Sequence, residues 1–263
     1  MKIVVIGGTG LIGSKVVAQL TELGHEAVPA SPRLGIDTIT GEGVAAAVDG
    51  ASAVIDVSNS MNFEYLTALE FFERSTHNLL AAETAARVGH HVALSIVGTK
   101  ALSQGGDPKA STAGYFRAKL TQEELIAASG IPYTIVHATQ FIEFIKAIAD
   151  VQARDGVVRV PPILFQPMAA TDVAKAVTRA AVGTPANGIV EAGGPDRAPM
   201  VDVIRRVLMA SGDQREVVSD PDVGYYGIAV SERTLVPGED AILGSVSVED
   251  WVRESANTPT GVS

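Results

Sequence analysis

The sequence contains no cysteine. Without Cys there can be no disulfide, no thiolate nucleophile and no Cys-ligated metal. The five histidines are scattered and lack the HExxH spacing of a zinc site, so we expect no bound metal. Any redox chemistry must therefore come from a bound organic cofactor.

Long apolar runs and an excess of positive charge are also missing. No run approaches membrane-spanning length, and because a strand is predicted to begin at Lys2 we expect no signal-type leader. With 30 acidic against 20 basic residues, the formal net charge is −10, which disfavours nonspecific binding to nucleic acid or anionic lipid. We expect a cytoplasmic protein with a small-molecule substrate, no nucleic-acid or membrane partner, and a homodimer as an open possibility.

Apolar residues make up 46% of the chain and charged residues 19%, as expected where parallel strands are buried on both faces. Short β-branched runs alternate with segments of helical periodicity. This alternation predicts an α/β fold, a doubly wound parallel sheet of the Rossmann type. The expected strands are 2–6, 25–30, 53–57, 91–97 and 133–138, and the expected helices are 11–23, 63–88 and 115–129.

The pattern loosens beyond Arg154. We assign 1–154 to a dinucleotide-binding core and 155–263 to a segment that completes the core and forms a small C-terminal α/β substrate lobe. Expected elements there are helices 171–182, 200–210 and 248–255 and a strand 188–192. The stretch 103–114, rich in Gly, Ser, Asp and Pro, predicts a flexible loop, which would be either a lid or substrate-contact loop or an ordinary surface loop.

A glycine-rich loop follows the first strand and opens a helix. In GGTGLIG, Gly7 allows the turn, Gly10 allows the backbone to approach a pyrophosphate, and Gly13 allows close helix packing. The same spacing could serve a structural turn, but its strand-loop-helix setting indicates dinucleotide binding.

The end of the second strand indicates which dinucleotide is bound. NAD-preferring sites usually carry Asp or Glu there, whereas this chain has Ser31 and Arg33. A serine hydroxyl and a guanidinium can both bond to a 2′-phosphate. NADP(H) is therefore favoured and NAD(H) stays possible. The alternative interpretation of Arg33 is a solvated loop residue.

Tyr115 and Lys119 lie four residues apart in a helical stretch, so their side chains share one face. An adjacent ammonium would stabilise a phenolate and make the phenol a usable acid near neutral pH. Lys119 could also hold the nicotinamide ribose. The alternative is an exposed helix face that merely contains Tyr and Lys.

Several segments together resemble the NmrA-like, atypical short-chain dehydrogenase/reductase family over about residues 1–182. They are GGTGLIG, DVSNS, LSIVG, YFRAK, IPYTIVHATQF and QPMAATDVA. The resemblance implies a Rossmann fold with a small substrate lobe. It also implies NAD(P)H-dependent reduction of quinones, ketones or related small molecules, or redox sensing without turnover.

The resemblance also implies roles for individual residues. Tyr115 would be the catalytic acid and Lys119 its modulator, with Ser95, Thr99 or neither as the accompanying hydroxyl. Val57 and Ser58 would flank the adenosine and its ribose. The pyrophosphate loop would comprise Gly7, Thr9, Gly10, Leu11, Ile12 and Gly13.

His137 stands where many relatives of that family have Arg. It is a candidate for contact with the nicotinamide or the substrate, and the alternative is a buried structural histidine. An apolar pocket suited to an aromatic or polyketide-like ligand would be lined by Met61, Phe63, Gln140, Phe141 and Phe144, unless these side chains belong to the core.

We therefore expect an NAD(P)-dependent oxidoreductase in which Tyr115 protonates the oxyanion of a carbonyl or quinone substrate. Two alternatives stay open. One is a nucleotide-sensing regulator without turnover, and the other is an isomerase or oxygenase that uses tightly held cofactor on the same fold.

Overall fold

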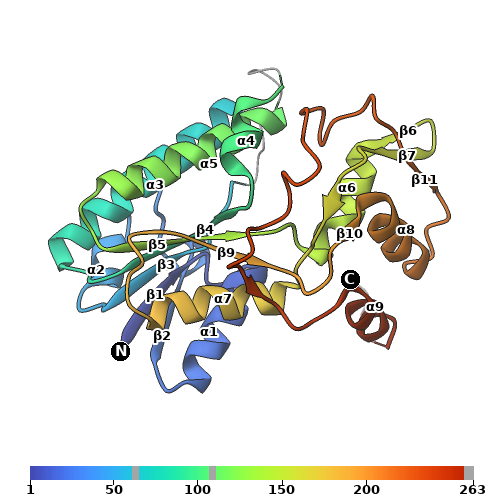
Figure 1. The fold of residues 1–263 in the computed structure, drawn as a ribbon. Coiled ribbons are helices and arrows are strands. Elements are labelled where there is room, and N and C mark those ends of the chain that lie inside the picture. The colour runs from blue at the N-terminus through green and yellow to red at the C-terminus, as the bar shows by residue number, and fades with distance from the viewer. Residues whose placement is uncertain (61–64, 107–110, 258–263) are drawn as a thin grey trace.

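A central parallel sheet organises the chain, and the computed structural model describes residues 1–60, 65–106 and 111–257 (Figure 1). The sheet has seven strands in the order β12-β9-β5-β4-β3-β1-β2, and every neighbouring pair is parallel. The chain moves outward from β1 to β2 and then returns past β1 to β3. This reversal creates the crevice at the carboxyl ends of β1 and β3 where ligands bind in open α/β sheets. The strands are β1 (Lys2–Ile6), β2 (Glu26–Ala30), β3 (Ala53–Asp56), β4 (His91–Ile96), β5 (Tyr133–Ala138), β9 (Gly188–Gly193) and β12 (Ile242–Leu243).

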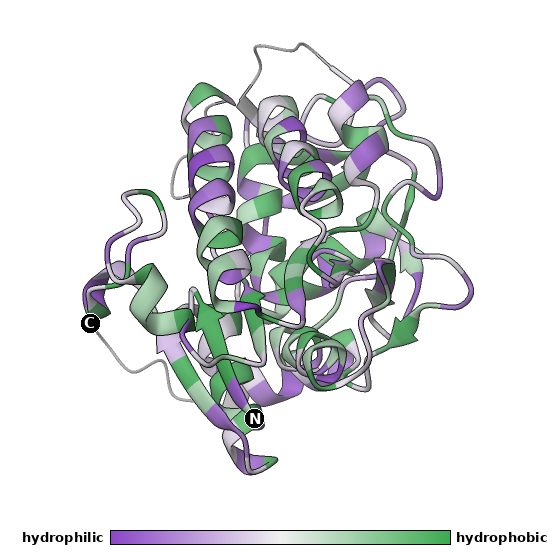
Figure 2. Cartoon of the chain, turned by 90° about the vertical axis from the view of Figure 1, so that its left-hand side faces the viewer, coloured by the Kyte–Doolittle hydropathy of each residue, from purple (hydrophilic) through white to green (hydrophobic). Residues whose placement is uncertain are grey.

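Helices cover both faces of this sheet, which explains its continuous apolar strands. In β1, Ile3 and Val5 pack in one core cluster, whereas Val4 and Ile6 pack in another on the opposite face. Figure 2 shows that the strands are largely hydrophobic, whereas the helices carry both hydrophobic and hydrophilic residues. The first face is covered by α1 (Leu11–Glu22) and α7 (Ala170–Val182), and the second by α2 (Val44–Val48), α3 (Tyr65–Ala86) and α5 (Ser111–Ala128), with α4 (Thr99–Gln104) following β4.

A smaller lobe lies beside the carboxyl ends of the strands (Figure 1). Its own apolar cluster includes Phe165, Met200 and Ile204, all with no exposed surface. The elements of the lobe are η2 (Ile142–Phe144), α6 (Ile145–Gln152), β6 (Ala153–Arg154), β7 (Val157–Val160), β8 (Leu164–Phe165), β10 (Ala198–Pro199), α8 (Met200–Ala210), β11 (Glu216–Ser219) and α9 (Val248–Asn257).

The chain leaves the lobe after β11, returns to the sheet to form β12, and then enters α9 (Figure 1). Asp172, in the first turn of α7, holds this returning segment. Its carboxylate accepts hydrogen bonds from the backbone N–H of Ser245 at 2.7 Å and of Val246 at 2.8 Å. Although burial raises the pKa of Asp172, these bonds and the ammonium of Lys175 hold it below the usual value.

The structure confirms the predicted doubly wound sheet and most of the expected elements. α8 occupies the predicted range. The division into a core of residues 1–154 and a segment 155–263 that completes it and forms a substrate lobe stays a prediction. Among the described residues, no helix combines the length and apolarity that crossing a bilayer requires.

The prediction of a loop over 103–114 was wrong at both ends, because α4 continues to Gln104 and α5 already begins at Ser111. Gly114, at the end of the predicted loop, lies inside α5. A Cβ at Gly114 would come within 2.3 Å of the Tyr65 Cβ, so the glycine permits close packing of α5 on α3. Residues 107–110 of this loop lie outside the described residues.

Candidate active site

The glycine loop between β1 and α1 forms a backbone cradle. Gly7 has a φ of +77°, and a Cβ there would lie 2.9 Å from the backbone nitrogen of Ser58. A Cβ on Gly13 would lie only 2.1 Å from the Gly7 carbonyl oxygen. These contacts leave no room for a side chain at Gly7 or Gly13, so both positions require glycine.

The helix that follows is open to an anion. α1 begins at Leu11 after Gly10, and no side chain caps it. The first N–H groups of a helix have no acceptor within the helix, and they carry its positive dipole end. The predicted residues Gly7, Thr9, Gly10, Leu11, Ile12 and Gly13 therefore form one continuous turn that fits a pyrophosphate.

The end of β2 contributes a second polar feature. The side chain of Ser31 is buried, and its hydroxyl oxygen has no hydrogen-bond partner among the described residues. Arg33 is exposed in the 3₁₀ turn η1 (Pro32–Leu34) and makes no ion pair with any described residue. Since buried polar atoms normally have partners, the Ser31 hydroxyl fits a site completed by a ligand.

Residues after β3 connect this cradle to the rest of the site. Val57 and Ser58 are half-buried, and the backbone of Ser58 packs against Gly7. The Ser58 hydroxyl donates to Oδ1 of Asp56 over 2.6 Å, and its backbone N–H donates to the same oxygen over 2.9 Å. Asp56 thus fixes the turn that borders the cradle.

Tyr115 lies near the start of α5, with Asn59 as a hydrogen-bond partner. Its hydroxyl donates to Oδ1 of Asn59 over 3.0 Å. The ring of Tyr115 packs edge-on against Phe72 and Phe116, with centroid distances of 6.0 and 5.7 Å. Burial raises the pKa of Tyr115 above its ordinary value, and the bond to Asn59 opposes this rise.

Lys119 is on the same face of α5, but the residue is only 3% exposed and its ammonium is bonded to other groups. Its Nζ donates to the Leu94 carbonyl over 2.8 Å and to Oε1 of Gln122, and it lies 4.7 Å from the centroid of the Phe72 ring. Gln122 in turn donates to Oδ2 of Asp56 over 2.9 Å. Burial lowers the pKa of Lys119 to about 8, against the opposing effect of Asp56 and Glu123.

A second buried network involves two predicted residues, Ser95 and His137. The Ser95 hydroxyl donates to Oε1 of Glu123, and the same oxygen lies 3.0 Å from Nε2 of His137. Ser95 is 4% exposed, so it would have to leave Glu123 before donating to a substrate. Thr99, the other candidate hydroxyl, has no exposed surface and donates to the Ile96 carbonyl.

The predicted pocket residues that can be described follow β5. Phe141 and Phe144 stack with a centroid distance of 5.5 Å and an interplanar angle of 28°, and Phe144 is 48% exposed. The amide nitrogen and oxygen of Gln140 are both buried without a partner among the described residues. Met61 and Phe63 lie outside the described residues.

Sequence reasoning missed Asn59, Gln122, Glu123 and Asp56. The α5 residues could have been found, because positions seven and eight after Tyr115 return to the same helix face. The sequence carries no comparable signal for Asn59, since its contact with Tyr115 joins residues 56 apart through the tertiary fold.

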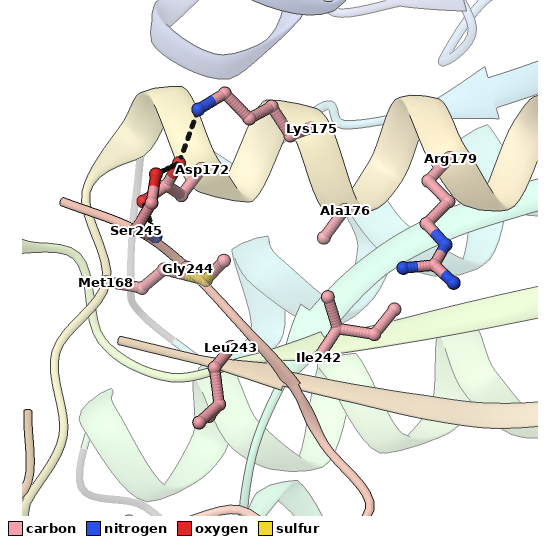
Figure 3. A pocket seen from close by; sticks show the side chains of 9 residues that line it. All are labelled: Met168, Asp172, Lys175, Ala176, Arg179, Ile242, Leu243, Gly244 and Ser245. Atoms are coloured by element: carbon pink, nitrogen blue, oxygen red, sulfur yellow. Dashed lines mark hydrogen bonds and ion pairs between the residues drawn. The ribbon is translucent and has the colours of Figure 1, made fainter. Parts of the chain in front are cut away.

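Two surface pockets of the described residues lie away from this site. One of about 170 Å³ lies between α7 and β12, where Arg179 projects toward Ile242 and Asp172 bonds to Lys175 and Ser245 (Figure 3). It shares no residue with the glycine loop or with Tyr115.

The fold and the glycine cradle define a protein of the Rossmann class. The family model described as NAD(P)H-binding matches residues 7–183, and the chain belongs to this family. No curated protein matches the sequence. Assignment to the NmrA-like group within this class stays a prediction.

Solved structures share the fold at low sequence identity. A short-chain dehydrogenase/reductase from Agrobacterium tumefaciens with bound NAD is 17% identical, covering 98% of this chain and 96% of that one, with a TM-score of 0.70. The Bordetella bronchiseptica enzyme WbmH in complex with NAD+ is 15% identical over 99% of both chains, with a TM-score of 0.70. A dTDP-4-dehydrorhamnose reductase from Bacillus anthracis in complex with NADP is 13% identical, covering 97% of this chain and 92% of that one, with a TM-score of 0.65.

Proposed function

We propose that the protein is an NAD(P)H-dependent oxidoreductase acting on a carbonyl or quinone carbon of a small molecule. The observation that carries this proposal is the bond between Tyr115 and Asn59. Asn59 follows Ser58, whose backbone packs against Gly7 of the glycine cradle. The phenol of a later helix is thereby held next to the loop that fits a pyrophosphate.

The residues of the site then have distinct tasks. The cofactor, when bound, supplies or accepts the hydride. Backbone N–H groups of the glycine loop hold its pyrophosphate, and Tyr115 donates a proton to the oxygen of the substrate as negative charge develops there. The buried ammonium of Lys119 anchors the inner face of α5 to the Leu94 carbonyl of β4 and so fixes the helix that carries Tyr115.

NADP(H) is the preferred form of the cofactor in this proposal. No carboxylate follows β2, where it would repel a 2′-phosphate. The unpartnered hydroxyl of Ser31 and the exposed guanidinium of Arg33 are both donors that suit a phosphate.

The substrate in this proposal is aromatic or polyketide-like. The stacked pair Phe141 and Phe144 leaves an aromatic surface half-exposed at the start of the lobe. Gln140 precedes this pair and carries a carboxamide whose donor and acceptor atoms have no described partner. Flat rings that carry a carbonyl oxygen would satisfy both features.

Turnover of a panel of quinones and aromatic ketones with NADPH tests the proposal. Tyr115→Phe should lower turnover by about 10²- to 10⁴-fold, because general acid catalysis contributes that much, and should leave NADPH binding nearly unchanged. Tyr133→Phe is the matched control, since Tyr133 begins β5 at the opposite end of the sheet. Unchanged turnover in Tyr115→Phe would remove the phenol from the mechanism. Tight NADPH binding without turnover of any compound would favour a sensor.

A further inference from the structure

The bond between Tyr115 and Asn59 raises the question of which group stabilises the phenolate. A phenol that gives up its proton leaves an anion, and an anion in a buried setting needs a donor. Tyr115 is half-buried, and its burial disfavours the phenolate. The donor must therefore come from a residue close to the hydroxyl.

The donors suggested by the sequence have other partners. Lys119 bonds to Leu94 and Gln122, and the hydroxyls of Ser95 and Thr99 bond to Glu123 and to the Ile96 carbonyl. These bonds lie among buried side chains, so each donor would lose an existing partner by turning to Tyr115.

Asn59 already bonds to Tyr115, so it can donate to the phenolate without giving up a bond to another described residue. It is exposed at the carboxyl end of β3, and its Oδ1 lies 3.0 Å from the Tyr115 hydroxyl. A carboxamide has an acceptor on one side and two N–H donors on the other, and a half-turn about its last torsion exchanges them. The same side chain can thus accept from a phenol and donate to a phenolate.

We infer that Asn59 is the hydrogen-bond partner that stabilises the Tyr115 phenolate during proton transfer. This inference rests on the proposed function, in which Tyr115 is the acid. The O–H bond of Tyr115 breaks, the proton moves to the substrate oxygen as the carbonyl carbon accepts hydride from NAD(P)H, and the electron pair stays on the phenolate. Nδ2–H of Asn59 then donates to that oxygen.

The direction in which the pKa of Tyr115 changes when Asn59 is removed shows whether Asn59 stabilises the phenolate. The ring of Phe72 on α3 contributes no charge, so the hydroxyl depends on polar neighbours. If Asn59 stabilises the phenolate, its loss raises the pKa of Tyr115, whereas an Asn59 that only accepts from the phenol would give a lower pKa when removed. The titratable groups on the elements around Tyr115 include Lys119 and Glu123 on α5, Asp56 on β3, and Tyr65 at the start of α3, which packs against Gly114.

The test replaces Tyr115 with 3,5-difluorotyrosine, whose phenol ionises at lower pH, and follows its ¹⁹F shift during a pH titration of the full-length protein. Asn59→Ala should raise the pKa of this phenol by about one unit, as expected for loss of one bond to an anion. Asn59→Asp should raise it further, because a carboxylate repels the phenolate. Asn187→Asp is the matched control, since Asn187 contacts Tyr133 at the far end of β5 and should leave the pKa unchanged.

An unchanged or lowered pKa in Asn59→Ala would overturn the inference. The titration needs neither substrate nor turnover, so its result is separate from the fate of the proposed function. If Tyr115→Phe keeps full turnover, the proposed function fails even where the pKa shift is found. If Tyr115→Phe is inactive and the pKa shift is absent, only the role of Asn59 fails.

Discussion

Tyr115 and Lys119 stand four residues apart on α5, yet their polar atoms have different partners: the phenol donates to Asn59 and the ammonium donates to Leu94 and Gln122. Through Gln122 and Asp56, Lys119 is linked to the turn at Ser58 that borders the glycine loop. The helix that carries the phenol and the loop that fits the pyrophosphate are therefore joined by one buried network.

The buried ammonium of Lys119 should make stability depend on pH in the alkaline range. Its pKa falls from 10.5 to about 8 on folding, so the unfolded chain binds more protons between these values. Unfolding free energy should therefore rise with pH from about 8 to about 10.5, by about 3 kcal/mol for an isolated group. Urea unfolding of the wild type and of Lys119→Met across this range measures the effect. The prediction fails if both proteins show the same pH dependence.

Gly13→Ala should damage the cofactor site. Its Cβ would lie 2.1 Å from the Gly7 carbonyl oxygen, so the loop must shift, at a cost of about 2 kcal/mol in stability. Calorimetric titration with NADPH should show affinity at least about tenfold weaker. Gly188→Ala is the control, because the nearest atom to a Cβ at that position lies at an ordinary 3.8 Å. Equal NADPH affinity in the two variants would show that cofactor binding does not depend on the backbone geometry of the glycine loop.

Arg33→Asp should change which cofactor binds. A carboxylate at this turn would repel a 2′-phosphate and could accept from ribose hydroxyls. We expect NADPH binding to weaken by about tenfold or more while NADH binding is kept or improved. Arg206→Asp makes the same charge change on α8 in the lobe and should alter neither affinity. Parallel loss for both cofactors in Arg33→Asp would contradict the assigned role.

Ser95→Ala distinguishes a buried structural hydroxyl from a catalytic one. Because Ser95 donates to Glu123 within the protein, we expect a loss of about 1 kcal/mol in stability and a smaller fall in turnover than in Tyr115→Phe. Thermal unfolding and turnover measured on the same preparations separate the two effects. A fall in turnover as large as that of Tyr115→Phe, at unchanged stability, would make Ser95 the catalytic hydroxyl.

Asp172→Ala should release the returning C-terminal segment. The change leaves the N–H groups of Ser245 and Val246 without their acceptor, at a cost of about 2 kcal/mol or more. Limited proteolysis should cut near β12 sooner than in the wild type. Asp202→Ala removes a carboxylate from an exposed pair with Arg205 and should have little effect. Cleavage at the same rate in both variants would argue against the role of Asp172.

Local patterns predicted the sheet and the glycine loop, because each βαβ unit shows its apolar periodicity over adjacent residues. The networks around Tyr115 were harder to predict. Asn59, Asp56 and Glu123 meet the residues singled out by motif only after distant strands and α5 have packed. The four-residue spacing of Tyr115 and Lys119 fixes a shared helix face, but the partners of each polar atom depend on what packs against that face.

A calorimetric titration of the wild type and Tyr115→Phe with NADPH and NADH, combined with turnover of carbonyl and quinone compounds, tests the cofactor site and the role of Tyr115 together. We expect both proteins to bind NADPH with similar affinity and more tightly than NADH, and only the wild type to turn over substrate. Failure of the folded wild type to bind either dinucleotide would contradict this expectation.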